Sequence, residues 1–228
     1  MPNLKTKDPK SLLICGCSFS SGWGFSEEKE DPMSWPNIVA DLLDYELTNI
    51  AKTAYSNQDI FLNTMHQATL KQYDLILVQF TTLGRVTLCP SKTSVTPNIP
   101  VGPVVFSGKP PTSVEMFTEQ ELQAFQKIFV TLNQDFKHLV NLIQMIETLQ
   151  LQFKNLYFIN GLIKWPRDPE MQHLIKQINP TRWVNLEKSW LANKIDTVST
   201  HDTHPGILSN QAFATQVVNF IKGKICQI

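Results

Sequence analysis

Residues 73–80, with the sequence YDLILVQF, decide which kind of fold this chain adopts. An almost continuous apolar run of this length is typical of a strand in a sheet that is covered on both faces. Sheets of that kind are mostly parallel, and parallel neighbours are joined by crossover helices. We therefore expect strands and helices to alternate on either side of this segment.

The flanking sequence has that alternation. Further strands are expected at residues 11–16 (SLLICG), 45–51 (YELTNIA) and 155–161 (NLYFING). Between and after them, apolar residues recur at helical spacing. The pattern predicts an α/β fold with three layers, α/β/α, and a parallel sheet.

Four helices are predicted from periodicity and capping residues. The first covers residues 34–43, with Ser34 as N-cap and Pro36 in its first turn, and the second is capped by Asn57. A long helix starts at Thr118, where Glu121 completes a capping box, and keeps its apolar stripe to about residue 149. Ser209 caps the last helix. The expected buried positions are Ile60, Phe61, Met65 and Ala68 in the second helix, Phe125, Ile128, Phe129, Leu132, Phe136, Leu139, Val140, Ile143 and Ile146 in the long one, and Phe213, Val217, Phe220 and Ile221 in the last.

Composition restricts the function classes. The 228 residues are enough for one well-cored domain, which we place at 1–228, and the 20 basic and 20 acidic residues cancel. Nucleic acids and anionic membranes both need a basic excess, so neither is expected as a partner. The apolar run after the charged N-terminus is too short for a signal peptide, so a cytoplasmic location is the default expectation. The stripe of the long helix is best read as core, and a homo-oligomer seam stays an alternative.

The four cysteines, Cys15, Cys17, Cys89 and Cys226, do not predict a metal site. No cluster of histidines and cysteines at zinc spacing accompanies them. A disulfide framework is not expected in a chain of this size without a secretion signal. We expect buried free thiols, and neither a metal nor an organic cofactor.

The proline-rich segment at residues 85–117 interrupts the alternation. It carries six prolines and no sustained periodicity. Loops of this length in compact domains are usually functional or mobile. Two interpretations stay open: a flap that covers the site, or a plain surface excursion.

The chemistry is expected where the first strand ends, at residues 16–20 (GCSFS). Ligands of parallel sheets bind at the carboxyl ends of the strands. The glycine spacing fits neither a Walker phosphate loop nor a dinucleotide fingerprint, because Trp23 stands where the lysine belongs and Glu27 where a third glycine should be. A serine on a turn, Ser18, remains as a candidate nucleophile.

A serine nucleophile needs a base, and residues 200–206 (THDTHPG) offer two histidines beside a carboxylate. Imidazole is suited to taking and returning a proton near neutral pH. His201 and His204 are both candidates, with Asp202 between them.

Gly16-Cys17-Ser18-Phe19-Ser20 resembles the Gly-Asp-Ser-x-Ser/Thr block of the SGNH (GDSL-type) hydrolases, with cysteine in place of aspartate. Residues 202–205 (DTHP) are similar to that family's Asp-x-x-His block, one residue shorter. Residues 49–54 (NIAKTA) resemble its second block, with alanines for both glycines. The resemblance extends in order and length from about residue 11 to 222.

The resemblance implies a flavodoxin-like SGNH hydrolase fold and a serine esterase that removes an acyl group, for example acetyl, from a small or carbohydrate-like substrate. Ser18 would be the nucleophile, His204 the base and Asp202 its orienting carboxylate. The backbone N–H groups of Ser18 and Ala54 would bind the oxyanion.

The third block departs from the family pattern. Leu83 stands where the family has an asparagine that donates to the oxyanion, and leucine cannot donate. Thr81 or Asn57 would have to replace that donor, and Arg85 could bind a substrate carboxylate or phosphate. Two alternatives therefore stay open: a catalytically inactive SGNH-fold binding module, and an acyltransferase that uses the same serine.

Overall fold

Four parallel strands form one sheet in the computed structural model, which describes residues 9–22, 33–85, 120 and 135–225. The strands are β1 (Lys10–Cys15), β2 (Tyr45–Asn49), β3 (Leu75–Phe80) and β4 (Leu156–Asn160), in the spatial order β2-β1-β3-β4. All three pairings are parallel, and Cys15 of β1 lies opposite Val78 of β3. This order is that of the flavodoxin-like sheets. The predicted α/β fold with a parallel sheet is confirmed.

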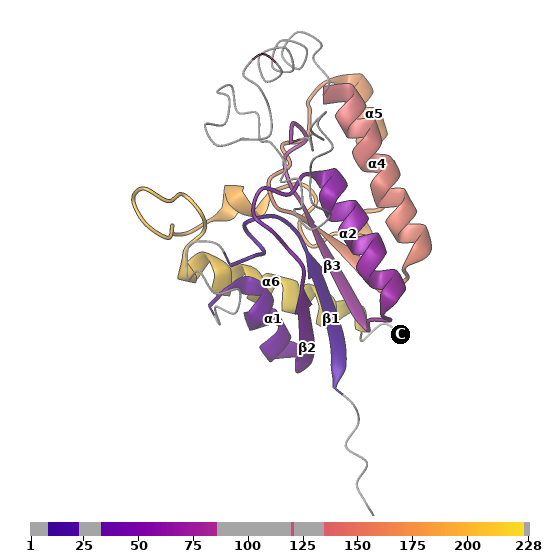
Figure 1. Ribbon diagram of the computed structural model, residues 1–228. Helices are drawn as coiled ribbons and strands as arrows, with labels where there is room; N and C mark the ends of the chain where they lie inside the picture. The colour runs from indigo at the N-terminus through magenta and orange to yellow at the C-terminus, as the bar shows by residue number, and fades with distance from the viewer. Residues whose placement is uncertain (1–8, 23–32, 86–119, 121–134, 226–228) are drawn as a thin grey trace, which may run out of the picture.

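Helices cover both faces of the sheet (Figure 1). Helices α1 (Trp35–Leu43) and α6 (Ile207–Ile225) pack together on one face, and α2 (Asn57–Leu70) and α4 (Asp135–Gln152) on the other. Helix α5 (Pro169–Ile175) and the 3₁₀ turns η1 (Pro180–Arg182) and η2 (Trp190–Asn193) follow β4. The three layers match the prediction.

Ser34 occupies the N-cap position of α1, as predicted, although its hydroxyl accepts a hydrogen bond from the Asn37 side chain and caps no backbone N–H. The starts of α2 and α6 differ from the predicted ones. Helix α2 is capped by Ser56, whose capping box with Asp59 leaves Asn57 as the first helical residue. Helix α6 begins at Ile207, so Ser209 lies in its first turn. Capping residues cluster at these helix starts, and composition alone does not choose among them.

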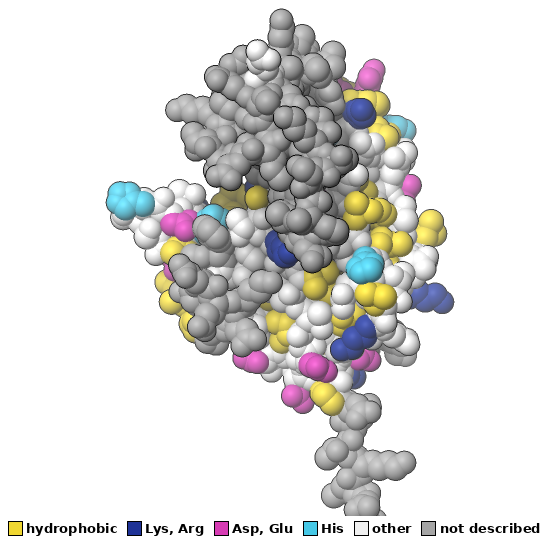
Figure 2. All heavy atoms as spheres, viewed as in Figure 1, with side chains coloured by type: hydrophobic (Ala, Val, Ile, Leu, Met, Phe, Trp, Pro, Cys, Tyr) yellow, Lys and Arg dark blue, Asp and Glu magenta, His cyan; other side chains and the backbone are white. Residues whose placement is uncertain are grey.

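The segment between η2 and α6 projects from the body of the molecule, at the left of Figure 1. Histidine and acidic side chains gather on this projection (Figure 2). We call its residues 196–206 the His204 loop.

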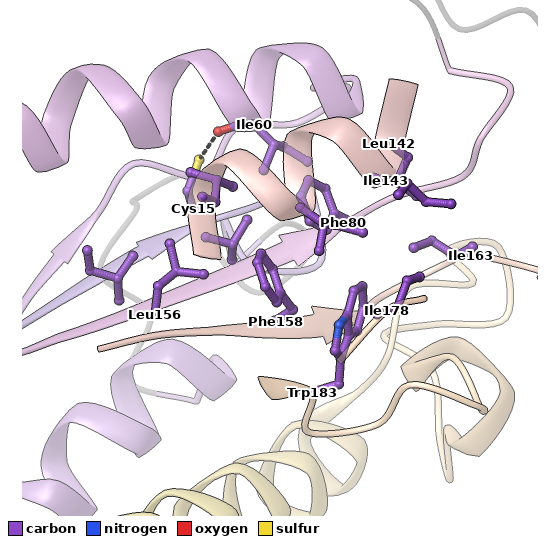
Figure 3. Packing of buried hydrophobic residues seen from close by; sticks show 14 of the residues in the cluster. Cys15, Ile60, Phe80, Leu142, Ile143, Leu156, Phe158, Ile163, Ile178 and Trp183 are labelled. Carbon is purple, nitrogen blue, oxygen red and sulfur yellow. Dashed lines mark hydrogen bonds between the residues drawn. The ribbon is translucent and has the colours of Figure 1, made fainter. Parts of the chain in front are cut away.

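Each face of the sheet has its own hydrophobic core. Leu13, Ile76 and Phe80 contribute to the core under α2 and α4, while Leu12 and Leu77 contribute to the core under α1 and α6. In the first core the Phe80 and Phe158 rings stack at 5.7 Å, and the Phe158 and Trp183 rings lie 5.1 Å apart (Figure 3). The alternation of faces along the strands follows from the period of two.

Most of the described part of the predicted α4 stripe is buried. Leu139, Ile143 and Ile146 are buried, whereas Val140 is half-buried and Phe136 is 48% exposed, which corrects the expected place of these two in the core. Leu142 and Leu149 are buried beside the expected positions. The helical period therefore holds along α4 from Leu139 onward.

Several predictions fall outside the described residues. They are the flap at residues 86–117, the helix start at Thr118 with Glu121, and the stripe positions from 125 to 132. Of the helices that the structure describes, none combines the length and apolar character needed to span a membrane.

Candidate active site

Ser18 lies in a tight turn directly after β1, at the carboxyl end of the sheet. We call residues 16–21 the Ser18 turn. The N–H groups of Ser20 and Ser21 both donate to the carbonyl oxygen of Cys17, at 2.9 and 3.1 Å, which folds the chain back sharply. Ser18 is only 7% exposed. The turn therefore places this hydroxyl at the end of a central strand with little freedom to move.

The His204 loop brings the predicted base to this serine. Nε2 of His204 lies 3.0 Å from Oγ of Ser18, and Nδ1 lies 2.6 Å from Oδ1 of Asp202. These three residues span almost the whole sequence, and the fold brings them into one hydrogen-bonded chain. When Nδ1–H donates to the carboxylate, the lone pair of Nε2 faces the Ser18 hydroxyl. That distance is within the reach of a general base.

Asp202 is held in its charged form. The backbone N–H of His204 donates to Oδ1 of Asp202 at 2.9 Å, and together with the imidazole this bond holds the pKa of the carboxyl below its ordinary value. The side chains of His204 and Asp202 are 25% and 30% exposed. A carboxylate that stays ionised keeps one imidazole tautomer and stabilises an imidazolium.

His201 is not part of the hydrogen-bonded series Ser18–His204–Asp202. It is exposed, and no hydrogen bond joins its ring to a described residue. The Phe19 ring instead lies edge-on to the His204 ring at 5.1 Å, and itself packs against Trp190. Of the two histidines left open by the sequence, the structure brings His204 to Ser18.

Two backbone N–H groups are available near the serine. Neither Ser18 nor Ala54 donates its N–H to another group in the described part of the chain. Ala54 is the third residue of a turn that the Tyr55 N–H closes onto the Lys52 carbonyl, and its φ is 66°. The Lys52 N–H in turn donates to the Gly16 carbonyl at 3.2 Å, which docks this turn against the end of β1.

The two candidates for the missing side-chain donor have different surroundings. The Nδ2 of Asn57 already donates to the carbonyls of Thr81 and Thr82, and its Oδ1 accepts from the Thr81 N–H at 2.8 Å. Asn57 thus fixes the end of β3 to α2 and has no N–H left for a ligand. The Thr81 hydroxyl is buried and has no hydrogen-bond partner among the described residues. Of the two, only Thr81 has a donor to offer.

Arg85 extends from the loop after β3 to the loop after β2. Its Nη1 donates to the Tyr55 carbonyl at 3.1 Å, whereas its Nε is buried without a partner in the described part of the chain. In the sheet, β1, which the Ser18 turn follows, lies between β2 and β3.

The thiols beside this site are both free and buried. Burial raises the pKa of the Cys15 thiol to about 12, and its Sγ donates to the Ile60 carbonyl (Figure 3). Cys15 is therefore a packing residue and not a nucleophile. Within the described ranges no three histidine, cysteine or carboxylate side chains are grouped as metal ligands.

Three amide side chains that were assigned no role from sequence contact the Ser18 turn or the His204 loop; Gln79 and Asn210 are buried, and Asn49 is half-buried. Gln79 of β3 contacts the Ser18 turn, Asn49 of β2 donates to the Ser20 carbonyl at 2.8 Å, and Asn210 of α6 donates to the carbonyls of Pro205 and Gly206. For Gln79 the signal in the sequence is a polar residue within the apolar run at 75–80, and Asn49 begins the segment that resembles the family's second block.

No protein-family model matches this sequence, and no curated protein resembles it in sequence. Solved structures do resemble it along nearly the whole chain. The psychrotrophic esterase EstA from Pseudoalteromonas, in a structure inhibited by monoethylphosphonate, is 12% identical, with a TM-score of 0.52 over 95% of this chain and 98% of its own. TesA is 11% identical, with a TM-score of 0.53 over 94% of this chain and 99% of its own.

A third similar structure is that of an acetyl-xylooligosaccharide esterase from Geobacillus. It is 9% identical, with a TM-score of 0.50 over 93% of this chain and 94% of its own. At such identities the likeness concerns the fold alone. The predicted fold, the α/β arrangement of SGNH hydrolase structures, is confirmed.

Proposed function

We propose that this protein is a serine esterase that cleaves an acyl ester through an acyl-enzyme formed on Ser18. The observation that carries the proposal is the hydrogen-bonded chain from Ser18 Oγ through the His204 ring to Asp202, with distances of 3.0 and 2.6 Å. A hydroxyl is a weak nucleophile until an adjacent base takes its proton, and this geometry supplies the base.

The reaction has two half-steps. Ser18 Oγ attacks the ester carbonyl carbon while its proton passes to His204 Nε2, and the tetrahedral intermediate collapses when the same proton moves to the leaving alcohol. Water then attacks the acyl-enzyme by the reverse path and releases the acid. Asp202 keeps the imidazole oriented and stabilises its charged form in both half-steps.

The oxyanion is bound by N–H groups that the fold leaves without another partner. We assign this role to the backbone N–H groups of Ser18 and Ala54, and we assign the third donor to the Thr81 hydroxyl in place of the family asparagine. Oxyanion donors act best when they are fixed before the reaction. The buried, unpartnered Thr81 hydroxyl and the docked turn at residues 52–55 favour these assignments.

The substrate class we infer is a small or carbohydrate-like ester with a short acyl group such as acetyl. The fold likeness to an acetyl-xylooligosaccharide esterase supports this class. We assign to Arg85 the recognition of a carboxylate or phosphate on the substrate, and the absence of a partner for its Nε among the described residues supports this role. Arg85→Gln should then slow hydrolysis of an ester that carries a carboxylate more than that of its neutral analogue.

Hydrolysis of 4-nitrophenyl acetate tests the activity, with labelling by a fluorophosphonate and mass spectrometry of the adduct. We expect turnover and a single adduct on Ser18, and neither in Ser18→Ala. Ser189→Ala is the matched control, because Ser189 only caps η2. Labelling of Cys17 or of another serine contradicts the assignment.

The second candidate is a binding module that has lost catalysis. Leu83 in place of the family asparagine favours it, because loss of one oxyanion donor costs about 10²–10³ in rate. A folded protein that neither reacts with the fluorophosphonate nor hydrolyses the ester supports this candidate. Transfer of the acyl group to an added sugar in preference to water would instead identify an acyltransferase.

A further inference from the structure

Gln79 is a polar residue in the middle of an apolar face. Leu77 and Leu75, two and four residues earlier on β3, belong to the core under α1 and α6, and the strand period places Gln79 on the same face. Its side chain is 0% exposed. A buried amide is costly unless its hydrogen bonds are made.

The hydrogen bonds of Gln79 go to the two sides of Ser18. Its Oε1 accepts from the Ser20 hydroxyl, and its Nε2 donates to Sγ of Cys17 at 3.5 Å. One amide group therefore contacts the residue before the serine and the second residue after it.

The neighbouring strands leave room for this side chain. A methyl group on Gly16 would lie 3.0 Å from both Cβ and Oε1 of Gln79 and 2.6 Å from the Ser20 hydroxyl. A methyl group on Gly161, just after β4, would overlap the Gln79 amide nitrogen. Glycine at both positions therefore leaves the space that the Gln79 side chain occupies.

We propose that Gln79 is a positioning residue that holds the Ser18 hydroxyl in line with His204. The inference rests on the proposed function and deepens it. His204 approaches Ser18 from a loop with few bonds to the sheet, so the direction of the serine hydroxyl depends on what holds the Ser18 turn. Gln79 from β3 and Asn49 from β2 hold that turn from the two flanking strands.

The experiment measures the inactivation of Ser18 by a fluorophosphonate, with the maximal rate kinact separated from the affinity KI. Gln79→Met keeps the length of the side chain and removes both hydrogen bonds. We expect kinact to fall about 10- to 100-fold with KI unchanged, because misplacement of a reacting group by about 1 Å has an effect of this size. In Ser20→Ala, which removes one of the two hydrogen bonds, kinact should fall less.

Asn160→Met is the matched control. Asn160 is a fully buried amide at the end of the adjacent strand β4, and it bonds the backbone of Ile163 and Leu186. Its loss should lower the melting temperature as Gln79→Met does, but leave kinact near the wild-type value.

Gln79→Glu adds a pH readout that a purely structural role would not give. A buried carboxyl is neutral over a wider pH range than an exposed one, and the neutral form can accept from Ser20 and donate to Cys17. The ratio of its kinact to that of the wild type should therefore fall as the pH rises and the carboxyl ionises. Circular dichroism at each pH confirms that the variant remains folded.

The outcomes separate the two proposals. A wild-type protein that does not react overturns both the proposed function and this inference. A reactive wild type with unchanged kinact in Gln79→Met, or an equal loss in Asn160→Met, overturns only the inference.

Discussion

The Ser18 turn and the His204 loop meet at one hydrogen bond, yet they are held in different ways. The Ser18 turn is buried, and its contacts reach Asn49, Gln79 and Trp35, which come from other elements of the chain. The His204 loop projects from the body, and many of its bonds are local, such as Ser199 N–H to the Asp202 carbonyl and Val198 N–H to the His204 carbonyl.

Because of this difference, substitutions in the two regions should affect stability and activity differently. The position of the serine depends on the packing of the whole sheet, so changes there alter stability and reactivity together. The position of the histidine depends on a short segment whose two ends are hydrogen-bonded to α6. Asp196 at one end accepts from Ser209, and Pro205 at the other end accepts from Asn210. Substitution of His204 should therefore alter activity far more than stability.

The largest effect is expected where the His204 loop meets Ser18. His204→Ala should lower kcat by about four orders of magnitude, as the loss of a triad member does. The free energy of unfolding should change by less than about 0.5 kcal/mol, since the ring is partly exposed. Steady-state kinetics and urea denaturation measure the two quantities.

His201→Ala is the control for that prediction, and it should change kcat by no more than about twofold, like an ordinary surface substitution. Asp202→Asn should lie between the two. If kcat falls more in His201→Ala than in His204→Ala, His201 and not His204 is the base.

The tie at the end of the loop should affect stability more than chemistry. The Asn210 side chain accepts from the backbone N–H of Trp35 at 2.9 Å and donates to the Pro205 and Gly206 carbonyls. Asn210→Ala removes the side-chain partner of the Trp35 backbone N–H and of the Pro205 carbonyl, while the Gly206 carbonyl keeps the backbone N–H of residue 210. The loss should cost about 2–4 kcal/mol of unfolding free energy. The bonds of Asp196 to the start of α6 remain, so we expect less than about a tenfold change in kcat.

Asn219→Ala on the exposed side of the same helix is the control, and it should be close to neutral in denaturant titrations. If Asn210→Ala lowers kcat as strongly as His204→Ala while remaining folded, the histidine depends on the fold as much as the serine does.

One substitution should relieve backbone strain in the turn at residues 52–55, which docks against the end of β1. Ala54 has a φ of 66°, in the left-handed region that costs a residue with a Cβ about 1–2 kcal/mol. Ala54→Gly removes this strain but increases the freedom of the unfolded chain, so a net gain of about 0.5–1 kcal/mol is expected. The backbone N–H is retained, and activity should be too.

Ala51→Gly gives the comparison for Ala54, because Ala51 is buried and lies outside that left-handed region. It should lower the melting temperature where Ala54→Gly raises it. A loss of stability in both variants would show that the strain at Ala54 is not released by glycine.

The smallest expected effect is a pH dependence at the base of the loop. Burial raises the pKa of Asp196, but hydrogen bonds from Ser209 and Leu208 outweigh it and hold the pKa below its ordinary value of 3.8. A lowered pKa in the folded state means that the carboxylate stabilises the fold above the ordinary value. That stabilisation is lost as the pH falls through the folded value.

The difference in unfolding free energy between the wild type and Asp196→Asn should therefore be constant from about pH 7 to pH 5 and shrink below that. Urea titrations at a series of pH values measure it. A difference that grows toward acid pH would mean that Asp196 is not stabilised as the carboxylate.

The sequence alone determined the strands, the parallel sheet and the two segments that meet at the site. Continuous apolar runs and helical spacing are local patterns, and in a parallel sheet the strand ends that follow them lie on one edge. Ser18, Asp202 and His204 could be named for that reason. The choice of His204 over His201 came from the resemblance to a family, since both are histidines in one polar loop.

Only the tertiary structure decided which polar groups are already bonded. It shows that the Asn57 amide donates to the carbonyls of Thr81 and Thr82, and that Gln79 bonds the Ser18 turn. It also places the backbone of Ala54 in the left-handed region of φ. These features depend on contacts between residues that are far apart in the chain. A hydrogen bond is set by distance and direction between two groups, and one sequence lists the groups without giving either.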